Sequence, residues 1–424
     1  MWEICVRGYR PLAGEIRIQG SKNGALPMLA ASLLQPGTIR FTNVPIIQDI
    51  TCMVGILESA GCRCRIEDHM VEVDASGILH PEIPREDVAK MRSSILVMGA
   101  LLGRLGRAEA WYPGGCSIGS RPIDLHLMAF SRLGARVEEE NGRIQAFAPH
   151  GLRGGEIVFP FPSVGATENA LLAAAGARGE TWIKGAAREP EIVSLCRLLR
   201  RMGADIQGEG SSCIRIRGGK SLCPVQSPIP GDRIVAGTYL AAVACAGGQA
   251  VVSGAPWQEM AAVIDAFRRC GAGIEPAYGE DEQIIGIKIQ MEDRPRAMDL
   301  STGPYPAFPT DLQSPMLAVL ARAKGTSHLR ETVFEARFKT AEELNKMGAC
   351  IRVEGNQAVI NGISRLQGTA VQAWDLRGGA AMAAAALGAE GVTLIKNCSH
   401  IQRGYEDICR DLSQLGGKIS WEPA

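Results

Sequence analysis

The stretch Ser59-Ala60-Gly61-Cys62-Arg63-Cys64-Arg65-Ile66-Glu67 joins the end of a helical pattern to an alternating, strand-like run. Gly61 stands where a glycine commonly ends a helix, and the alternation after it is typical of a half-buried strand. A hydrophobic or small residue followed by glycine ends a helical pattern six times, at Ser59-Ala60-Gly61, Arg132-Leu133-Gly134, Arg201-Met202-Gly203, Arg269-Cys270-Gly271, Lys346-Met347-Gly348 and Gln414-Leu415-Gly416. These signals lie roughly 70 residues apart, which indicates an internal repeat.

A second landmark keeps the same spacing. Short alternating runs begin at Gly37, Gly179, Gly248, Gly325 and Gly391, each after an alanine- and leucine-rich helical pattern. The repeating unit is therefore strand, helix, strand, helix, strand, strand, and six copies predict an α/β protein of two domains with three βαβαββ repeats each. The stretch 218–232, rich in proline and glycine, follows the third unit and is the best linker candidate. The early strand-like run 15–19 is free to pair with either domain.

The composition excludes several classes of function. The chain has 424 residues with 45 basic and 45 acidic side chains, which argues against nucleic-acid or membrane binding. Its thirteen cysteines are irregularly spaced and the N-terminus lacks a signal-peptide profile, so we expect reduced thiols in a cytoplasm. Neither the cysteines nor the six histidines show metal-ligand spacing, so the sequence predicts no metal and no cofactor. The most apolar run, 379–387, is too short to cross a bilayer.

The loop 111–126, Trp-Tyr-Pro-Gly-Gly-Cys-Ser-Ile-Gly-Ser-Arg-Pro-Ile-Asp-Leu-His, has the composition of a site. Glycines flank Cys116 on both sides, and Arg121 opens a helical pattern, where an arginine and unpaired backbone N–H groups suit a phosphate or carboxylate. These positive surroundings would favour the thiolate form of Cys116 and prepare it for proton transfer or nucleophilic attack. The alternative is that Cys116 is one cysteine among many in an ordinary flexible turn.

The starts of the first helices of the six units carry cations. The residues there are Ser21-Lys22-Asn23, Met91-Arg92-Ser93, Ser163-Val164-Gly165-Ala166-Thr167, Asp232-Arg233, Thr310-Asp311 and Asp375-Leu376-Arg377. Serine, threonine and aspartate can be simple helix caps, but a cation at a helix N-terminus opposes the dipole unless an anion lies between. We therefore expect a shared anionic ligand. Arg337 and Arg403 hold the position in their units that Arg121 holds in the second, although each alone would read as a surface arginine.

Five motifs together carry a resemblance to a known family. They are Gly20-Ser21-Lys22-Asn23-Gly24-Ala25-Leu26-Pro27, the cysteine loop 113–126, Phe308-Pro309-Thr310-Asp311-Leu312-Gln313, Glu331-Thr332-Val333-Phe334-Glu335 and Asp375-Leu376-Arg377. Over essentially its whole length the chain resembles the UDP-N-acetylglucosamine 1-carboxyvinyltransferases, the enolpyruvyl transferases of peptidoglycan synthesis. The cysteine loop distinguishes them from the related 5-enolpyruvylshikimate-3-phosphate (EPSP) synthases.

The resemblance implies an inside-out α/β barrel fold in two domains, residues 1–21 plus 231–424 as the catalytic domain and residues 22–230 as the domain that carries the cysteine loop. It also implies an activity. The enolpyruvyl group of phosphoenolpyruvate moves to the 3′-hydroxyl of UDP-N-acetylglucosamine by addition and elimination, with release of phosphate and without a metal, in the first committed step of peptidoglycan synthesis.

The resemblance assigns roles by position. Lys22, Arg121 and Arg403 would hold the phosphate of phosphoenolpyruvate, Asn23 would touch both substrates, and Arg377 with Arg337 would serve the carboxylate. Cys116 would protonate the methylene carbon and would be alkylated by fosfomycin, and Asp311 could take the hydroxyl proton or only position that hydroxyl. The UDP-sugar would be bound by Arg92, Arg121, Pro122, Ile123, Asp124, Leu125, Ser163, Val164, Gly165, Asp311 and Val333.

Two positions depart from the family pattern. Phe161-Pro162 replaces the usual Lys-Val, which removes a cation from the expected nucleotide site, and Val235 replaces a usual acid. Neither change touches the expected chemistry, so we expect the activity with an altered nucleotide affinity. Two alternatives remain: enolpyruvyl transfer to another hydroxyl acceptor, and a non-catalytic paralogue that binds a UDP-sugar.

Overall fold

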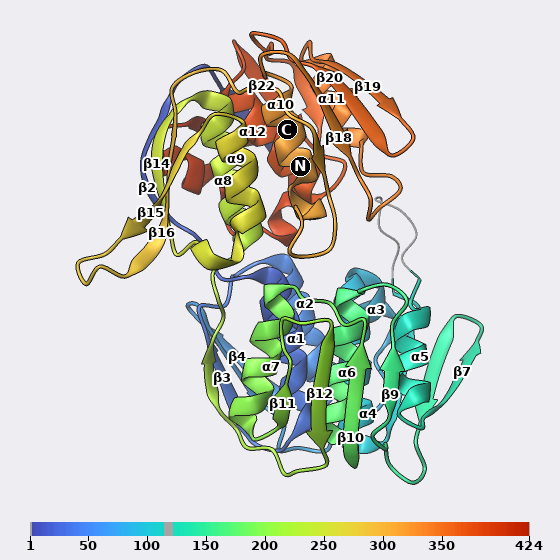
Figure 1. Ribbon diagram of the computed structural model, residues 1–424. Coiled ribbons are helices and arrows are strands. Elements are labelled where there is room, and N and C mark those ends of the chain that lie inside the picture. Colours follow the sequence, from blue (N-terminus) through green and yellow to red (C-terminus); the bar gives the residue numbers. More distant parts are fainter. Residues whose placement is uncertain (1, 114–121, 424) are drawn as a thin grey trace. The chain divides into compact units, whose positions relative to one another are not determined.

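The computed structural model describes residues 2–113 and 122–423 (Figure 1). Contacts between Cα atoms divide this part of the chain into two units. We call residues 20–113 and 122–230 the N-terminal unit, and residues 2–19 and 231–423 the C-terminal unit. Each unit has a hydrophobic core of its own, so each is described separately.

The N-terminal unit contains three consecutive repeats. The first consists of α1 (Lys22–Ala31), η1 (Ser32–Leu34), β3 (Thr38–Thr42), α2 (Gln48–Ser59), β4 (Arg63–Glu67) and β5 (Met70–Asp74). The second consists of α3 (Arg85–Lys90), η2 (Arg92–Ile95), α4 (Leu96–Leu105), β6 (Arg107–Trp111), α5 (Asp124–Arg132), β7 (Arg136–Glu140) and β8 (Arg143–Phe147). The third consists of β9 (Glu156–Val158), α6 (Val164–Gly176), β10 (Gly179–Lys184), α7 (Pro190–Met202), β11 (Asp205–Gln207) and β12 (Cys213–Gly218), and β13 (Gln226–Pro228) follows it.

The C-terminal unit begins with β1 (Trp2–Arg7) and β2 (Leu12–Arg17) and continues after residue 230. Its first repeat has α8 (Arg233–Ala246), β14 (Gly248–Ser253), η3 (Trp257–Glu259), α9 (Ala261–Arg269), β15 (Gly273–Tyr278) and β16 (Ile284–Met291). The next has β17 (Leu300–Ser301), η4 (Thr310–Leu312), α10 (Gln313–Leu320), β18 (Thr326–Arg330), α11 (Lys339–Lys346), β19 (Cys350–Glu354) and β20 (Gln357–Asn361). The last has β21 (Ala370–Gln372), α12 (Leu376–Leu387), β22 (Val392–Lys396), η5 (Cys398–Arg403), α13 (Ile408–Gln414) and β23 (Lys418–Pro423).

The six sheets formed by the described residues confirm the predicted repeat. Five of them have four strands, in which one parallel edge strand is followed by three antiparallel ones: β13-β3-β5-β4, β9-β10-β12-β11, β2-β14-β16-β15, β17-β18-β20-β19 and β21-β22-β1-β23. The sixth, β6-β8-β7, has three strands, and a single parallel bridge between Glu82 and Glu109 stands where the edge strand is expected.

The leading strands of two repeats are exchanged. β2 pairs in parallel with β14, from Leu12 opposite Gly248 to Arg17 opposite Ser253, and so belongs to the C-terminal unit. β13 pairs in parallel with β3. The prediction that 218–232 is a linker is therefore wrong in part, because β13 lies inside it. Pro228 is tolerated there because β13 is an edge strand, where a missing N–H breaks no ladder.

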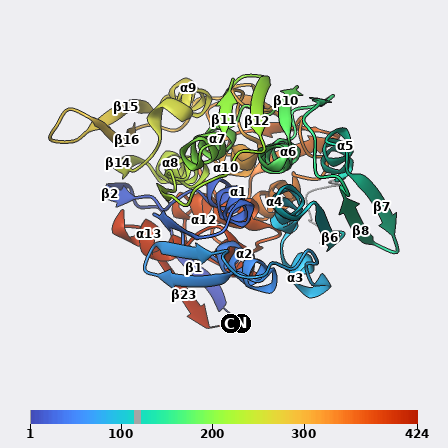
Figure 2. The same cartoon turned by 90° about the horizontal axis from the view of Figure 1, so that it is seen from below.

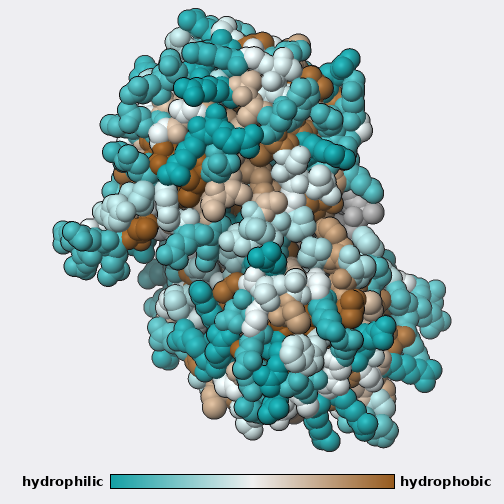
Figure 3. Space-filling view, in the orientation of Figure 1, coloured by the Kyte–Doolittle hydropathy of each residue, from teal (hydrophilic) through white to brown (hydrophobic). Residues whose placement is uncertain are grey.

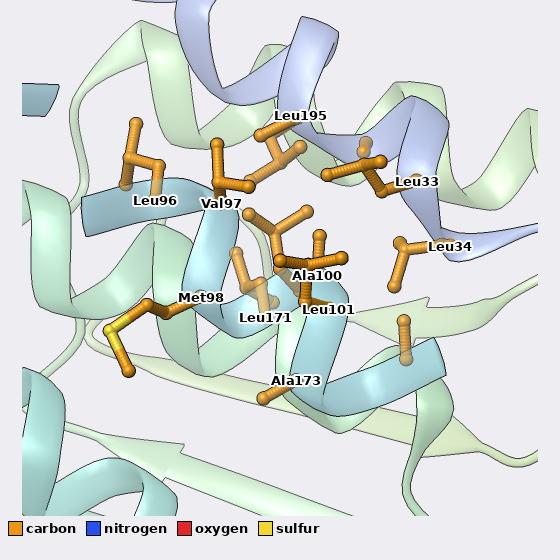
Figure 4. Close-up of a cluster of buried hydrophobic side chains, with 14 of the residues drawn as sticks. Leu33, Leu34, Leu96, Val97, Met98, Ala100, Leu101, Leu171, Ala173 and Leu195 are labelled. Carbon is orange, nitrogen blue, oxygen red and sulfur yellow. The ribbon is translucent and has the colours of Figure 1, made fainter. Parts of the chain in front are cut away.

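The helices α1, α4 and α6 lie at the centre of the N-terminal unit with its sheets outside them, which is the inside-out arrangement that the family resemblance implied (Figures 1 and 2). Ten of the 13 residues of α6 are buried, among them the polar Thr167, Glu168 and Asn169, so this helix lies in the interior of the unit. Figure 4 shows Leu33 of η1, Leu101 of α4, Leu171 of α6 and Leu195 of α7 pointing toward one another. In the C-terminal unit the alanine-rich α12 is buried over eleven of its 12 residues and packs on α8 and α10.

Hydrophilic residues predominate on the face drawn in Figure 3, and hydrophobic ones are scattered among them. None of the helices in the described ranges has the length and apolar character needed to cross a membrane.

Candidate active site

Asp311 lies between two buried arginines in the C-terminal unit. Its Oδ1 accepts a hydrogen bond from Arg337 Nη2 at 2.8 Å, and its Oδ2 accepts from Arg377 Nη2 at 3.0 Å and Nε at 3.3 Å. Arg377 is 3% exposed and Arg337 4%. Burial acts to lower the pKa of the Arg377 guanidinium, but Asp311, Tyr405 and Asp232 together outweigh it and raise the pKa above its ordinary value. The carboxylate is thus the counter-ion that keeps two desolvated cations in place.

A second layer of side chains orients the two arginines. Arg337 Nη1 donates to Thr310 Oγ1 at 2.6 Å, and that hydroxyl donates to Glu331 Oε2 at 2.9 Å. On the other side, Arg377 lies over the ring of Tyr405, with 5.8 Å between its Cζ and the ring centroid. Tyr405 is 1% exposed, and its hydroxyl is 2.8 Å from Thr238 Oγ1. The guanidinium planes are therefore fixed before any ligand arrives.

Two backbone features lie beside this cluster. Asp375 caps α12, where its Oδ1 accepts from the N–H groups of Arg377 and Gly378, both at 2.9 Å. Glu331 Oε1 accepts from the N–H groups of Val333, at 2.8 Å, and Phe334, at 3.1 Å. This contact shapes the turn at Val333, whose backbone the family resemblance assigns to the UDP-sugar.

Lys22 is the first residue of α1 in the N-terminal unit. Ser21 caps this helix, because its Oγ accepts from Gly24 N at 3.1 Å. Lys22 Nζ is 3.2 Å from Asp49 Oδ2, and Asp49 is 3% exposed at the start of α2. The cost of a cation at a helix N-terminus is thus offset here by a protein carboxylate, as it is at Arg377.

Three further predicted residues, Arg92, Ser163 and Gly165, lie near His126 in the N-terminal unit, at η2, α5 and the start of α6. Ser163 caps α6, with its Oγ 3.4 Å from Ala166 N. Arg92, at the start of η2, lowers the pKa of the buried His126, and burial is the larger cause; together they bring it to about 4. Gly165, the second residue of α6, lies against the His126 ring.

The other predicted residues divide into described and undescribed ones. Cys116 and Arg121 lie outside the described residues. In the described part, Pro122 and Asp124 are exposed and Ile123 is buried, while the half-buried positions are Asn23, Leu125, Val164, Val333 and Arg403. Arg403 ends η5. Of the five predicted helix caps, Ser21, Ser163, Asp232 and Asp375 are confirmed. Thr310 does not cap its helix and instead joins Glu331 to Arg337.

Sequence reasoning missed the residues that position the predicted site residues. Asp49, Thr238 and Tyr405 carry no signal of their own, because an aspartate in a first turn or a tyrosine after Arg-Gly reads as ordinary structure. Glu331 lay inside a recognised motif without an assigned role. His126 and Asn169 were not singled out, because their contact joins residues far apart in the sequence.

The described residues offer no grouping of three or more histidine, cysteine, aspartate or glutamate side chains suited to a metal ion. Cys62 and Cys64, the closest cysteine pair, are thiols whose pKa burial raises to about 12.

Known structures with this arrangement define the class of fold. The enolpyruvyl transferase NikO from Streptomyces tendae superposes with a TM-score of 0.88 at 24% identity, covering 100% of this chain and 99% of that one. An EPSP synthase from Acinetobacter baumannii superposes with a TM-score of 0.77 at 18% identity over the full length of both. The fold is that of the enolpyruvyl transferases.

Sequence comparison identifies the family. The profile described as EPSP synthase (3-phosphoshikimate 1-carboxyvinyltransferase) matches residues 6–412. The UDP-N-acetylglucosamine 1-carboxyvinyltransferase 2 of Carboxydothermus hydrogenoformans is 44% identical over 99% of both chains, and the corresponding enzyme of Saccharophagus degradans is 44% identical over the full length of both. The chain belongs to the EPSP synthase family and, within it, to the UDP-N-acetylglucosamine 1-carboxyvinyltransferases.

Proposed function

We propose that this enzyme transfers the enolpyruvyl group of phosphoenolpyruvate to the 3′-hydroxyl of UDP-N-acetylglucosamine and releases phosphate. The observation that carries the proposal is the Arg337–Asp311–Arg377 cluster, in which two buried cations flank one carboxylate. Phosphoenolpyruvate is polyanionic near neutral pH, so its site needs several fixed cations. Arg337 and Arg377 would hold the carboxylate, and Lys22, Arg121 and Arg403 would hold the phosphate, with Asn23 touching both substrates.

The proposed chemistry has two steps. In the addition, the Cys116 thiol gives its proton to the methylene carbon, the sugar hydroxyl oxygen bonds to C2, and Asp311 accepts the hydroxyl proton. In the elimination, the Cys116 thiolate takes back a proton from the new methyl group and the bond between C2 and the phosphate oxygen breaks, which restores the double bond. The departing phosphate takes the proton that Asp311 accepted. The UDP-sugar would be bound by Arg92, the run 121–125, Ser163, Val164, Gly165, Asp311 and the backbone at Val333.

Phosphate release tests this function. Incubation with both substrates should release phosphate, and a variant that combines Cys116→Ala with Lys22→Ala should release none above background. Equal release by the wild type and this double variant, or no release by either, would exclude the proposed transfer.

Phe161 bears on the identity of the hydroxyl acceptor. This residue is 46% exposed and precedes Pro162, where the family pattern carries a lysine. A second candidate function is therefore transfer to a different hydroxyl acceptor. A panel of hydroxyl acceptors, with phosphoenolpyruvate held constant, separates the two by their kcat/KM values. Binding of a UDP-sugar without turnover of any acceptor would point to the non-catalytic paralogue, against which the complete Arg337–Asp311–Arg377 cluster argues.

We further propose a place in peptidoglycan synthesis, which the family resemblance implies, in a reducing cytoplasm, because the cysteines of the described residues form no disulfide. Fosfomycin tests the reactive thiol. It should add one covalent mass to the wild type and none to Cys116→Asp, measured by intact-protein mass spectrometry. An unchanged wild-type mass would contradict a reactive Cys116.

A further inference from the structure

Asn169 joins three elements in the core of the N-terminal unit. It is 0% exposed on α6. Its Oδ1 accepts from Gly99 N of α4 at 2.9 Å, and its Nδ2 donates to Ile95 O of η2 at 3.0 Å. The same Nδ2 is 2.7 Å from Nδ1 of His126 on α5. One amide thus connects α4, α5 and η2 to α6.

These contacts fix the tautomer of His126. A backbone N–H only donates and a backbone carbonyl only accepts, so Gly99 and Ile95 leave one orientation for the Asn169 amide. In that orientation Nδ2 faces the ring and donates, and His126 Nδ1 must accept. The proton of the neutral imidazole is therefore on Nε2.

That Nε2–H has no protein acceptor among the described residues. The ring is 7% exposed, and its Cε1–Nε2 edge lies beside Gly165, where a Cβ would be 3.1 Å from Cε1 and 3.4 Å from Nε2. The absence of a side chain at Gly165 therefore leaves the donor uncovered at the first turn of α6, next to the Ser163 cap. A buried ring with an unused donor at a helix N-terminus is suited to a ligand oxygen.

The charge of the ring suits the same purpose. Burial and the Arg92 guanidinium on η2 hold the pKa of His126 at about 4, so the ring is neutral near pH 7. Burial and Arg92 set the pKa of the ring, and the nearest acidic neighbours in sequence on these helices, Glu168 on α6 and Asp124 on α5, do not raise it.

We propose that Asn169 is a positioning residue that presents the Nε2–H of His126 as a neutral hydrogen-bond donor to a diphosphate oxygen of the nucleotide-sugar acceptor. The inference rests on the proposed function. It supplies a polar contact to a nucleotide site that lacks the usual lysine, since Phe161-Pro162 stands in its place. A neutral donor also makes acceptor binding independent of pH between about 6 and 8, because the ring does not titrate there.

Asn169→Asp tests the tautomer directly. A carboxylate only accepts, so the neutral ring would turn its proton to Nδ1 and present a bare Nε2 to the diphosphate. At pH 8 we expect the KM for UDP-N-acetylglucosamine to rise roughly ten- to hundredfold, with the KM for phosphoenolpyruvate unchanged. The new carboxylate also raises the pKa of His126, so acidification restores the Nε2 proton and the acceptor KM should recover toward pH 6. The wild-type KM should stay flat over that range.

His126→Phe is the second variant, because it keeps a ring of similar size and removes the donor. It should raise the acceptor KM at every pH without the recovery that Asn169→Asp shows. A pH-independent KM in Asn169→Asp, or a parallel loss for both substrates in either variant, would overturn the positioning role. If Asn169→Asp fails to fold, the test is a calorimetric comparison of the UDP affinities of the wild type and His126→Phe. Weaker binding by His126→Phe supports the proposal, and equal affinities refute it. Tight UDP binding by a wild type that releases no phosphate would separate failure of the proposed function from failure of this inference.

Discussion

Asp311 uses both carboxylate oxygens to bind arginines that are themselves expected to hold the substrate carboxylate. A protein carboxylate and a ligand carboxylate then compete for the same donors. Substrate binding would release Asp311 from at least one arginine, and a released carboxylate is a stronger base than an ion-paired one. The question left open by the sequence, base or positioning group, thus depends on the state of this ion pair.

Asp311→Asn separates the two effects. The amide cannot take a proton, so kcat should fall by about 10²–10⁴. The amide also competes poorly for the guanidinium groups, so phosphoenolpyruvate should bind at least as tightly as to the wild type, measured by calorimetry. Weaker binding in this variant would show that Asp311 supports the substrate rather than competing with it.

Glu168 illustrates a different use of a buried acid. Its side chain is 5% exposed on α6, and burial, followed by the charges of Glu191 and Glu189, raises its pKa well above the ordinary value. The unfolded chain loses this proton near pH 4.5 while the folded chain retains it. The contribution of Glu168 to stability is therefore full at low pH and is lost as the pH rises through the folded pKa.

Glu168→Gln removes that dependence while keeping the shape. The variant should match the wild type near pH 4.5 and become progressively more stable than the wild type toward pH 8. Urea denaturation at several pH values measures the difference. A constant difference across the series would mean that Glu168 ionises normally in the folded chain.

At the scale of elements, glycines set how closely α4 and α6 approach. A Cβ on Gly176 would stand 2.0 Å from the carbonyl oxygen of Gly103, and one on Gly99 would stand 2.4 Å from Asn169 Oδ1. Both obstacles are too close for a side chain, and the first is backbone. The amide that orients His126 therefore depends on this helix contact.

Gly176→Ala should lower the free energy of unfolding by about 2–3 kcal/mol, because neither helix backbone can move aside freely. The matched control is Gly55→Ala in α2, where a Cβ would meet nothing within 4 Å. There the variant should gain about 0.5–1 kcal/mol through helix propensity. Urea denaturation midpoints of the two variants should move in opposite directions.

Much of the fold was predictable because each repeat carries local sequence signals at its helix ends and strands. A glycine such as Gly61 or Gly203 ends a helix in a left-handed conformation, and alternation after it announces a strand. β13 was not predictable, since three residues that include a proline carry no periodicity and are a strand only through pairing with β3. The same distinction holds for the site, where residues with a local sequence signal were predictable and residues defined by distant contacts were not. Arg377 and Lys22 stand at helix starts where a cation is conspicuous, but Asp49 and Tyr405 act through partners that are distant in sequence.

At the scale of the whole molecule, the two units differ in the segments of the chain that form them. The strands of the N-terminal unit all come from residues 20–230, within the described part. The C-terminal unit needs residues 2–19 as well, because β1 lies between β22 and β23 and β2 forms the edge beside β14. Removing β1 would separate β22 from β23 and would take Ile4 and Val6, both 0% exposed, out of the core.

Three fragments test this dependence. Residues 20–230 should unfold cooperatively in urea. Residues 231–424 should lack a cooperative transition, because their last sheet is missing its central strand. A permuted chain, in which residues 231–424 continue through a short turn into residues 2–19, should recover it. The turn is feasible because Trp2 pairs with Pro423 in an antiparallel ladder, which brings the two ends of the chain together (Figure 1). An equal transition in the permuted and unpermuted fragments would show that β1 and β2 are dispensable, and that α8, α10 and α12 alone organise the core of this unit.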